Sequence, residues 1–181
     1  MEPRAMAEDP RLSHPAAQPV DLLLRACRIR RERRSGPGGQ HRNKVETAVV
    51  IEHLPTGTRG EASERRSQEQ NRIRAVFRLR VRLALGIRFP IDDLGRYKPS
   101  PIWKSRLSGR RVSVSREHDD FPALLAEALD AIVAAEFRLP SAAAVLGTTS
   151  SQLVRFLAQE PAALAIVNAN RRARKLRPCK A

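Results

Sequence analysis

The stretch SGPGGQ at residues 35–40 is the part of the sequence whose residue types and spacing best suit chemistry. Three glycines and a proline in six residues exclude a regular helix or strand, so the stretch must be a loop. Gly38 and Gly39 lack a Cβ atom and adopt positive φ readily, which lets the backbone approach a reactant closely. Gln40 follows them. The loop contains no general base.

Two further motifs follow this loop along the chain. The loop continues as HRNKVETAV to Val49, HLPTG occupies residues 53–57, and RSQEQNR occupies residues 66–72. In order and spacing these motifs resemble those of the class I peptide chain release factor family. A GGQ tripeptide alone would mean nothing, whereas three motifs in register are a specific signal. The resemblance runs from about Leu22 to Arg88.

The resemblance implies hydrolysis of the ester that joins a nascent peptide to the terminal ribose of tRNA, in the peptidyl transferase centre of the ribosome. Gly38, Gly39 and Gln40 would be the catalytic residues. By analogy to the family, the backbone N–H of Gln40 would stabilise charge on the tetrahedral intermediate or the leaving oxygen. The Gln40 side chain would position water and exclude bulkier nucleophiles. The tRNA and the ribosome would supply the rest, so we expect neither a cofactor nor a metal.

Cations flank the loop and also end the chain, and we expect them to neutralise RNA phosphates. Ser67, Gln68 and Asn71 resemble the family's helix-start residues, whose expected role is to support the loop or to touch RNA. The residues expected to bind RNA or the ribosome are Arg33, Arg34, Ser35, Arg42, Asn43, Lys44, Arg66, Arg72, Arg171, Arg172, Arg174 and Lys175.

The expected partners follow from the same resemblance. They are the ribosome, through large-subunit ribosomal RNA at the peptidyl transferase centre, and peptidyl-tRNA as the substrate. The basic C-terminal tail could enter the mRNA channel. Gln40 is a candidate for N5-methylation, which would add a glutamine methyltransferase. We expect a monomer.

The net charge of +15, from 34 Lys and Arg against 19 Asp and Glu, favours a polyanionic partner. Nucleic acid fits better than a membrane surface, because the arginines are spread over many short segments. Glu127 and Asp130 interrupt the longest apolar stretch, which excludes a membrane-spanning helix there. Cys27 and Cys179 match no zinc or disulfide pattern and fit a reducing compartment. We expect a bacterial-type cytosol, with an organelle matrix as the second choice.

The elements that must position the loop indicate an α+β fold. Alternation predicts a strand over residues 45–52, with Val49 and Ile51 on one face, and a partner strand over residues 58–63. Ser67 and Gln70 have capping-box spacing. The following run suits either a strand or a helix, and the cap favours a helix that ends at Gly86, with Ile73 and Val76 among the residues on its apolar stripe.

The remaining organisation is predicted from composition and helical spacing. We expect a disordered lead over residues 1–21, the GGQ domain over 22–88, a basic linker over 89–118 with one short strand near Arg111, and a helical module over 119–181 with a basic tail. Trp103 and Tyr97 either pin the linker to a domain or stack on RNA bases.

The helical module should contain four helices. They cover residues 121–136, a short stretch from Pro140 to Gly147, residues 151–159, and a stretch that starts at Pro161. The middle pair resembles a helix-turn-helix. It fits either a bundle that merely packs, a module that docks on RNA or the ribosome, or a DNA-binding unit with Gln152 and Arg155 as its readers.

Complete class I release factors carry additional domains that read stop codons, and we find no counterpart before the loop. The leading expectation is therefore termination or, more specifically, codon-independent rescue of stalled ribosomes. Two alternatives stay open at this point. One is a non-catalytic module that binds the ribosome or its RNA, and the other is a helix-turn-helix regulator that binds DNA.

Overall fold

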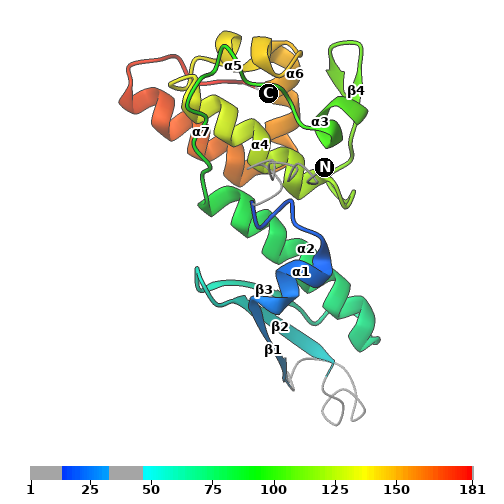
Figure 1. Cartoon of the computed structure of the whole chain (residues 1–181). Coiled ribbons are helices and arrows are strands. Elements are labelled where there is room, and N and C mark those ends of the chain that lie inside the picture. Colours follow the sequence, from blue (N-terminus) through cyan, green and yellow to red (C-terminus); the bar gives the residue numbers. More distant parts are fainter. Residues whose placement is uncertain (1–13, 33–46, 181) are drawn as a thin grey trace, which may run out of the picture. The chain divides into compact units, whose positions relative to one another are not determined.

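The computed structural model describes residues 14–32 and 47–180, and the predicted α+β class is confirmed. The chain divides into two compact units. We call residues 18–83 the sheet unit, and residues 14–17 together with 84–180 the helical unit. Each unit is described by itself (Figure 1).

The sheet unit begins with helix α1 (Val20–Arg25) and contains three antiparallel strands in the order β1-β2-β3. Strand β1 spans Cys27–Glu32, β2 spans Ala48–His53 and β3 spans Thr58–Ala62. The predicted hairpin is therefore confirmed, and β1 adds a third strand on the other side of β2.

Alternation of side chains explains which face of β2 is buried. Val49 and Ile51 are 2% and 0% exposed, and His53 is also buried on the same face. The intervening Val50 and Glu52 are only half-buried. The period-two pattern thus predicted both the strand and its apolar face.

Helix α2 (Gln68–Gly86) resolves the ambiguous run as a helix that ends at the expected glycine. Its buried row is Asn71, Ala75, Leu79 and Leu83, at a spacing of four, and all four residues are 0% exposed. The apolar stripe predicted from the sequence is wrong at Ile73, which is 58% exposed. The first residue of the buried row is instead the polar Asn71, whose side chain can be buried because it is hydrogen-bonded there.

Gly60 lets α2 lie directly on β3. A Cβ atom at this position would lie 2.2 Å from the carbonyl oxygen of Ala75 and 2.5 Å from the amide nitrogen of Leu79. Both atoms belong to the backbone and cannot move aside as a flexible side chain would. The closeness of helix and sheet therefore requires glycine here.

The helical unit holds the four helices predicted for it. They are α4 (Phe121–Ala134), α5 (Leu139–Val145), α6 (Ser150–Ala158) and α7 (Pro161–Ala173). Proline occupies the first turn of three of them, where its missing N–H is tolerated. Gly147, with a φ of 68°, ends the α5 segment as expected. The unit also contains a short helix, α3 (Pro101–Ser105), and a two-stranded hairpin of β4 (Leu107–Ser108) and β5 (Arg111–Val112).

The expected linker over residues 89–118 packs within the helical unit instead of forming a separate connector. Trp103 is 0% exposed, and its Nε1 donates to the carbonyl oxygen of Leu146 over 2.8 Å. Its ring also meets that of Phe156 edge-on, at 5.7 Å between centroids. A buried indole with its N–H satisfied fixes the segment to the bundle. Stacking of Trp103 on RNA is therefore ruled out in this structure.

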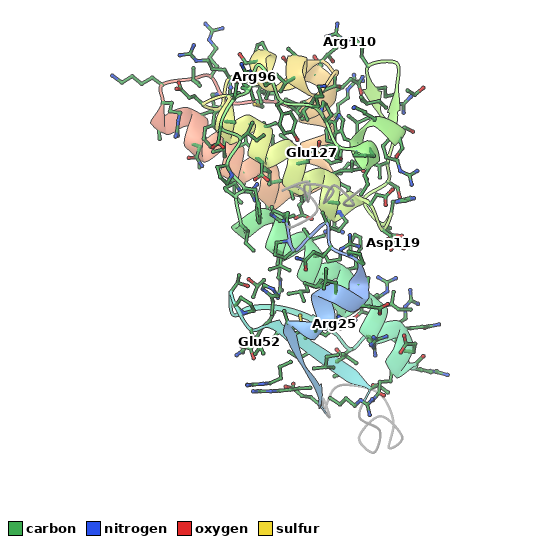
Figure 2. The ribbon with its side chains drawn as sticks, viewed as in Figure 1. Arg25, Glu52, Arg96, Arg110, Asp119 and Glu127 are labelled. Carbon is green, nitrogen blue, oxygen red and sulfur yellow. The ribbon has the colours of Figure 1, made fainter. Side chains whose placement is uncertain are left out.

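Two buried acids of α4 tie the same segment down (Figure 2). Glu127 accepts hydrogen bonds from the backbone N–H and hydroxyl of Ser100, and from the hydroxyl of Tyr97 at 2.9 Å. Asp130 accepts from Arg88 at 3.0 Å and from the backbone N–H of Phe89 at 3.1 Å. These acids interrupt the apolar sequence of α4 because they satisfy buried polar groups.

The disordered lead expected over residues 1–21 is wrong for its last part. Residues 14–18 form bends and turns, and α1 begins at Val20. His14 is 2% exposed; its Nδ1 accepts from the backbone N–H of Ala16, and its ring packs against Phe89 at 4.9 Å. Burial of this imidazole orders the segment. Residues 1–13 lie outside the described residues.

Candidate active site

The predicted catalytic loop joins two strand ends that the structure defines. Strands β1 and β2 pair antiparallel, and their last register pair is Glu32 with Ala48. The intervening residues 33–46 lie outside the described residues. They include the predicted residues Arg33, Arg34, Ser35, Gly38, Gly39, Gln40, Arg42, Asn43 and Lys44.

Asn71 holds the return end of the loop in place. Its side chain is fully buried, and its Nδ2 donates to the carbonyl oxygens of Thr47 at 2.7 Å and Arg65 at 2.8 Å. Its Oδ1 accepts from the backbone N–H of Arg65 at 2.9 Å. One carboxamide thereby joins the start of α2, the turn before it, and the residue that leads into β2.

The sequence pattern identified Asn71 only as a helix-start residue that supports the loop or touches RNA. Its contacts favour the first role, because its side chain bonds to the residue that follows the loop. Since this side chain is completely buried, it cannot touch RNA in this structure. The signal that could have found this role is its spacing. Asn71 begins the row that continues as Ala75, Leu79 and Leu83, so its side chain must face the sheet.

The predicted cap of α2 is present in part. The hydroxyl of Ser67 accepts from the backbone N–H of Gln70 at 3.3 Å, and its carbonyl oxygen accepts from the N–H of Asn71 at 3.1 Å. These bonds satisfy donors of the first helical turn. The SQEQN stretch thus starts the helix and sets the position of Asn71 in its first turn.

Several arginines of α2 serve the fold. Arg78 donates to the carbonyl oxygen of Glu61 at 2.8 Å and to the carboxylate of Glu64 at 2.7 Å. One turn later, Arg82 donates to the carbonyl oxygen of Arg59 at 2.6 Å. These bonds fasten the helix to the edge strand β3. Arg78 and Arg82 therefore stabilise the packing of the helix on the sheet.

The two predicted RNA-binding residues beside α2 differ in their surroundings. Arg66 is exposed, and within the described part of the chain it has no ion pair. Arg72 forms a surface ion pair with Glu69 at 3.1 Å, which is too exposed to contribute much stability. Both guanidinium groups can therefore reach a phosphate, Arg72 after releasing Glu69.

Strand β1 presents more cations at the edge of the sheet. Arg28, Arg30 and Arg31 are all exposed. Glu52 on β2, labelled in Figure 2, pairs with Arg59 over 2.9 Å, and that hydrogen bond lowers the pKa of the Glu52 carboxyl. The Glu52 carboxylate is thus already paired, and the three arginines of β1 remain exposed to an anionic partner.

The HLPTG motif forms the turn between β2 and β3. Gly57 has a φ of 66°, and the carbonyl oxygen of His53 accepts from its N–H at 2.8 Å. Nδ1 of His53 and the hydroxyl of Thr56 form a hydrogen bond of 2.9 Å, and the same hydroxyl bonds to that of Thr58 at 2.9 Å. Burial lowers the pKa of His53. This histidine is a structural residue of the turn.

Comparison with known proteins assigns this unit. Residues 17–90 match the RF-1 domain family. The chain is 48% identical to peptide chain release factor 1 of Acidiphilium cryptum over 71 residues, and this match covers 38% of this chain and 20% of that protein. It is 54% identical to peptide chain release factor 2 of Paramagnetospirillum magneticum over 57 residues, covering 32% of this chain and 15% of that protein. The chain therefore contains an RF-1 domain over residues 17–90, and over this segment it is similar to peptide chain release factors.

A third relative, peptide chain release factor 2 of Thermomicrobium roseum, is 45% identical over 92 residues, or 49% of this chain and 25% of that protein. The matches thus span between 15% and 25% of the relatives' length. The RF-1 domain contains all three motifs, and residues 91–180 follow it. Within the described residues, no helix has the length and apolar character needed to cross a membrane.

The C-terminal cations lie beyond the RF-1 domain, and two of the four predicted ones are engaged in the fold. Arg171 donates to the carbonyl oxygens of Phe137 and Arg177, and Arg174 lies 4.4 Å from the centre of the Phe137 ring. Arg172 and Lys175 are exposed, and their side chains form no hydrogen bond or ion pair in the described ranges.

The basic tail is attached to α7 in this structure. Asn168 donates to the carbonyl oxygen of Cys179 at 3.1 Å and accepts from its N–H at 2.7 Å. The N–H of Leu176 donates to the carbonyl oxygen of Arg171 at 2.8 Å. Entry of the tail into a channel would require release of these bonds.

Proposed function

We propose that the chain hydrolyses the ester of peptidyl-tRNA on the ribosome. The observation that carries this proposal is the RF-1 domain over residues 17–90, which includes the Gly38-Gly39-Gln40 sequence between two paired strand ends. The rest of that domain supports it as a rigid frame, because Asn71 and Gly60 fix the strands against α2.

In the proposed reaction, water attacks the ester carbonyl carbon and the bond to the ribose oxygen breaks. One water proton passes to the ribose oxygen, and the peptide leaves as its carboxylic acid. The backbone N–H of Gln40 would stabilise negative charge in this step, and its side chain would position the water. Gly38 and Gly39 would allow the backbone to reach the ester.

The proposed setting is codon-independent rescue of stalled ribosomes in a bacterial-type cytosol. Exposed cations support docking on ribosomal RNA, and in the RF-1 domain they include Arg66 and the arginines of β1. Further cations, such as Arg172 and Lys175, would add contacts from the helical unit. The tail would reach the mRNA channel only after leaving α7. Methylation of Gln40 is a further element of this proposal, detectable as a mass increase in the tryptic peptide.

The test measures release of labelled peptide from purified ribosomes that carry peptidyl-tRNA in the P site. Three complexes are compared, with a stop codon, a sense codon or no message in the A site. Rescue predicts release without a stop codon. Gln40→Ala should slow release by about 10²-fold, since misplaced water is a costly loss of orientation. Gln70→Ala, an exposed glutamine in the same domain, is the matched control and should release as wild type does.

Binding is measured on the same complexes by co-sedimentation. Gln40→Ala should bind as tightly as wild type, which separates lost chemistry from lost docking. Release only with a stop codon would replace rescue with ordinary termination. Tight binding with no release by wild type on any complex would refute hydrolysis and leave a ribosome-binding module.

A further inference from the structure

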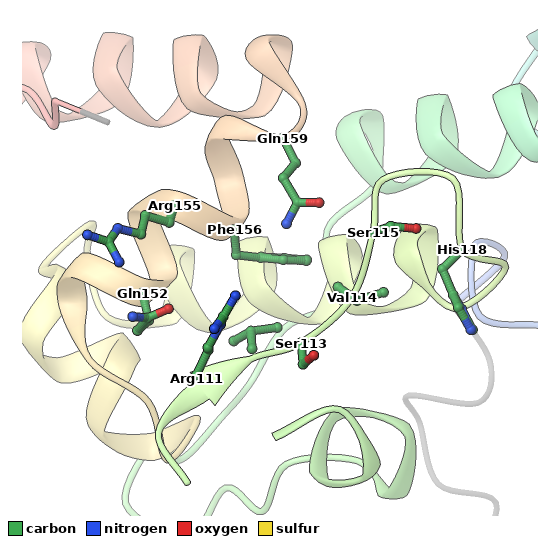
Figure 3. Close-up of a pocket in the computed structure, with 10 residues that line it drawn as sticks. Arg111, Ser113, Val114, Ser115, His118, Gln152, Arg155, Phe156 and Gln159 are labelled. Atoms are coloured by element: carbon green, nitrogen blue, oxygen red, sulfur yellow. The ribbon is translucent and has the colours of Figure 1, made fainter. Parts of the chain in front are cut away.

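A cleft in the helical unit lies outside the RF-1 match and contains charge that the fold does not use. It has a volume of about 590 Å³, and its two walls are strand β5 with the residues that follow it, and helix α6 (Figure 3). Phe156 forms part of its floor. The polar residues that line it are Arg111, Ser113, Ser115, His118, Gln152, Arg155 and Gln159.

Contacts at both ends hold the strand wall along α6. At one end, the hydroxyl of Thr148 donates to the carbonyl oxygen of Arg110 at 2.6 Å, and Arg110 donates back to the carbonyl oxygen of Thr148 at 2.9 Å. At the other end, Arg116 donates to the carboxylate of Glu160 at 2.8 Å. Thr148 precedes α6 and Glu160 follows it, so the segment between the two contacts is held in place along the helix. The cleft is therefore a built feature of the unit.

The charge in the cleft is positive and unneutralised. No aspartate or glutamate lines it. The nearby acids Glu160 and Asp120 are already paired, with Arg116 and Arg106 respectively. The side chains of Arg111 and Arg155, which come from opposite walls, are exposed and form no hydrogen bond or ion pair within the ranges the structure describes. Two guanidinium groups in one groove suit the oxygens of phosphates.

The shape of the cleft favours a single strand over a duplex. A helix that reads duplex DNA must protrude into a major groove about 12 Å wide. Here the face of α6 that bears Gln152, Arg155 and Gln159 looks into a cleft whose other wall is strand β5 (Figure 3). Phe156 is only 2% exposed, so stacking of bases on it is not available either. Recognition must therefore use the backbone of a narrow chain.

We propose that this cleft binds the phosphodiester backbone of single-stranded RNA. Arg111 and Arg155 contact successive phosphates, while the carboxamides of Gln152 and Gln159 bond to ribose hydroxyls, which DNA lacks at the 2′ position. This site gives the helical unit a role of its own in holding RNA. It does not depend on hydrolysis, because every lining residue lies in the helical unit.

The test uses the full chain and a fluorescein-labelled single-stranded RNA of mixed sequence, about 12 nucleotides long to exceed the cleft. Fluorescence anisotropy gives the Kd as a function of salt. The variant is Arg111→Gln with Arg155→Gln. The matched control is Lys98→Gln with Lys104→Gln, which removes the same charge at exposed residues of the same unit outside the cleft.

Loss of two phosphate contacts should reduce the slope of log Kobs against log salt by about 1.4 and weaken binding roughly tenfold at 0.15 M salt. The control should change either quantity much less. Gln40→Ala should bind RNA as wild type does, so failure of the hydrolysis proposal stays distinguishable. Since neither cleft arginine side chain forms a hydrogen bond or ion pair in the described part of the chain, the variant should retain the wild-type circular dichroism spectrum and melting temperature.

Three outcomes would overturn the proposal. Equal weakening in the cleft variant and the control would show that only net charge matters. Duplex DNA that binds more tightly than RNA and depends on Arg155 would restore the helix-turn-helix interpretation. Poly-glutamate or inorganic phosphate that displaces the RNA at stoichiometric concentration would assign the cleft to an acidic peptide or to a small anion.

Discussion

Replacement of Asn71 with aspartate tests whether one buried carboxamide holds the root of the catalytic loop. The two side chains have almost the same size and shape, so packing is conserved. The Nδ2 group that donates to Thr47 and Arg65 becomes a carboxylate oxygen. The carbonyl oxygens of Thr47 and Arg65, in part-buried hydrogen bonds, then lose their donor and face another acceptor, at a side chain that is 0% exposed.

The expected loss in free energy of unfolding of the sheet unit is about 3–5 kcal/mol. Each buried carbonyl left without its donor costs about 1–3 kcal/mol, and burial of a carboxylate adds to this. Burial should also raise the pKa of the new acid, so the loss should shrink at low pH, where the protonated group can donate one hydrogen bond. A stability effect that responds to pH in this direction is specific to the proposed geometry.

Hydrogen exchange is the suitable assay because the chain has two compact units and its unfolding need not be two-state. Protection of amides in β2 and α2 should fall by about 10²–10⁴-fold, and amides of α4 provide an internal reference. Gln70→Glu introduces the same charge at the preceding, exposed position and should change protection by less than about threefold. Equal losses in the two variants, or unchanged protection in Asn71→Asp, would refute the role assigned to this residue.

Three further predictions follow from packing and burial. Gly60→Ala should destabilise the sheet unit by about 3 kcal/mol or more, because the new methyl group would meet the backbone of Ala75, and hydrogen exchange of β3 measures this. Burial lowers the pKa of His14 to about 4 from 6.5, so its stabilising contribution is complete above pH 6.5 and is lost as the pH falls towards 4. Between neutral pH and pH 5, the wild type should therefore lose about 2 kcal/mol of unfolding free energy that His14→Phe does not lose. Urea unfolding of both proteins at neutral pH and at pH 5 measures this difference. Trp103→Phe leaves the carbonyl oxygen of Leu146 without its donor and should lower the melting temperature of the helical unit in calorimetry, by a change of about 1–3 kcal/mol; a shift within error would show that the indole N–H is dispensable.

Much of the fold could be predicted because its signals are local. Alternation located β2, the Pro-Thr-Gly turn located the hairpin, and proline and glycine marked the ends of helices in the second half. The choice of a helix for residues 68–86 rested on its cap, and that choice is confirmed. Periodicity failed at Ile73 because two apolar stripes were compatible with the sequence, and only the sheet decides which one is buried.

What could not be predicted depends on partners far apart in the chain. Trp103 bonds to a residue 43 positions later, and Glu127 to one 27 positions earlier, so composition alone made residues 89–118 look like a connector. Helix α3 has only five residues, too short for periodicity, although Ser100 before a proline is a recognisable cap. Asn71 was noticed as part of a motif, but its partners at Thr47 and Arg65 are visible only in three dimensions.

The same limit applies most strongly to the arginines, on which the proposals for RNA binding depend. An arginine whose guanidinium group binds a backbone carbonyl oxygen cannot be distinguished in the sequence from one whose guanidinium group is free to bind a phosphate. Arg78, Arg82 and Arg171 are held by the fold, whereas Arg111 and Arg155 are held by nothing in the described residues. Net charge therefore overstates the RNA-binding surface. If this division is right, substitution of Arg82 should lower stability and leave the salt slope of RNA binding unchanged, and substitution of Arg155 should do the reverse.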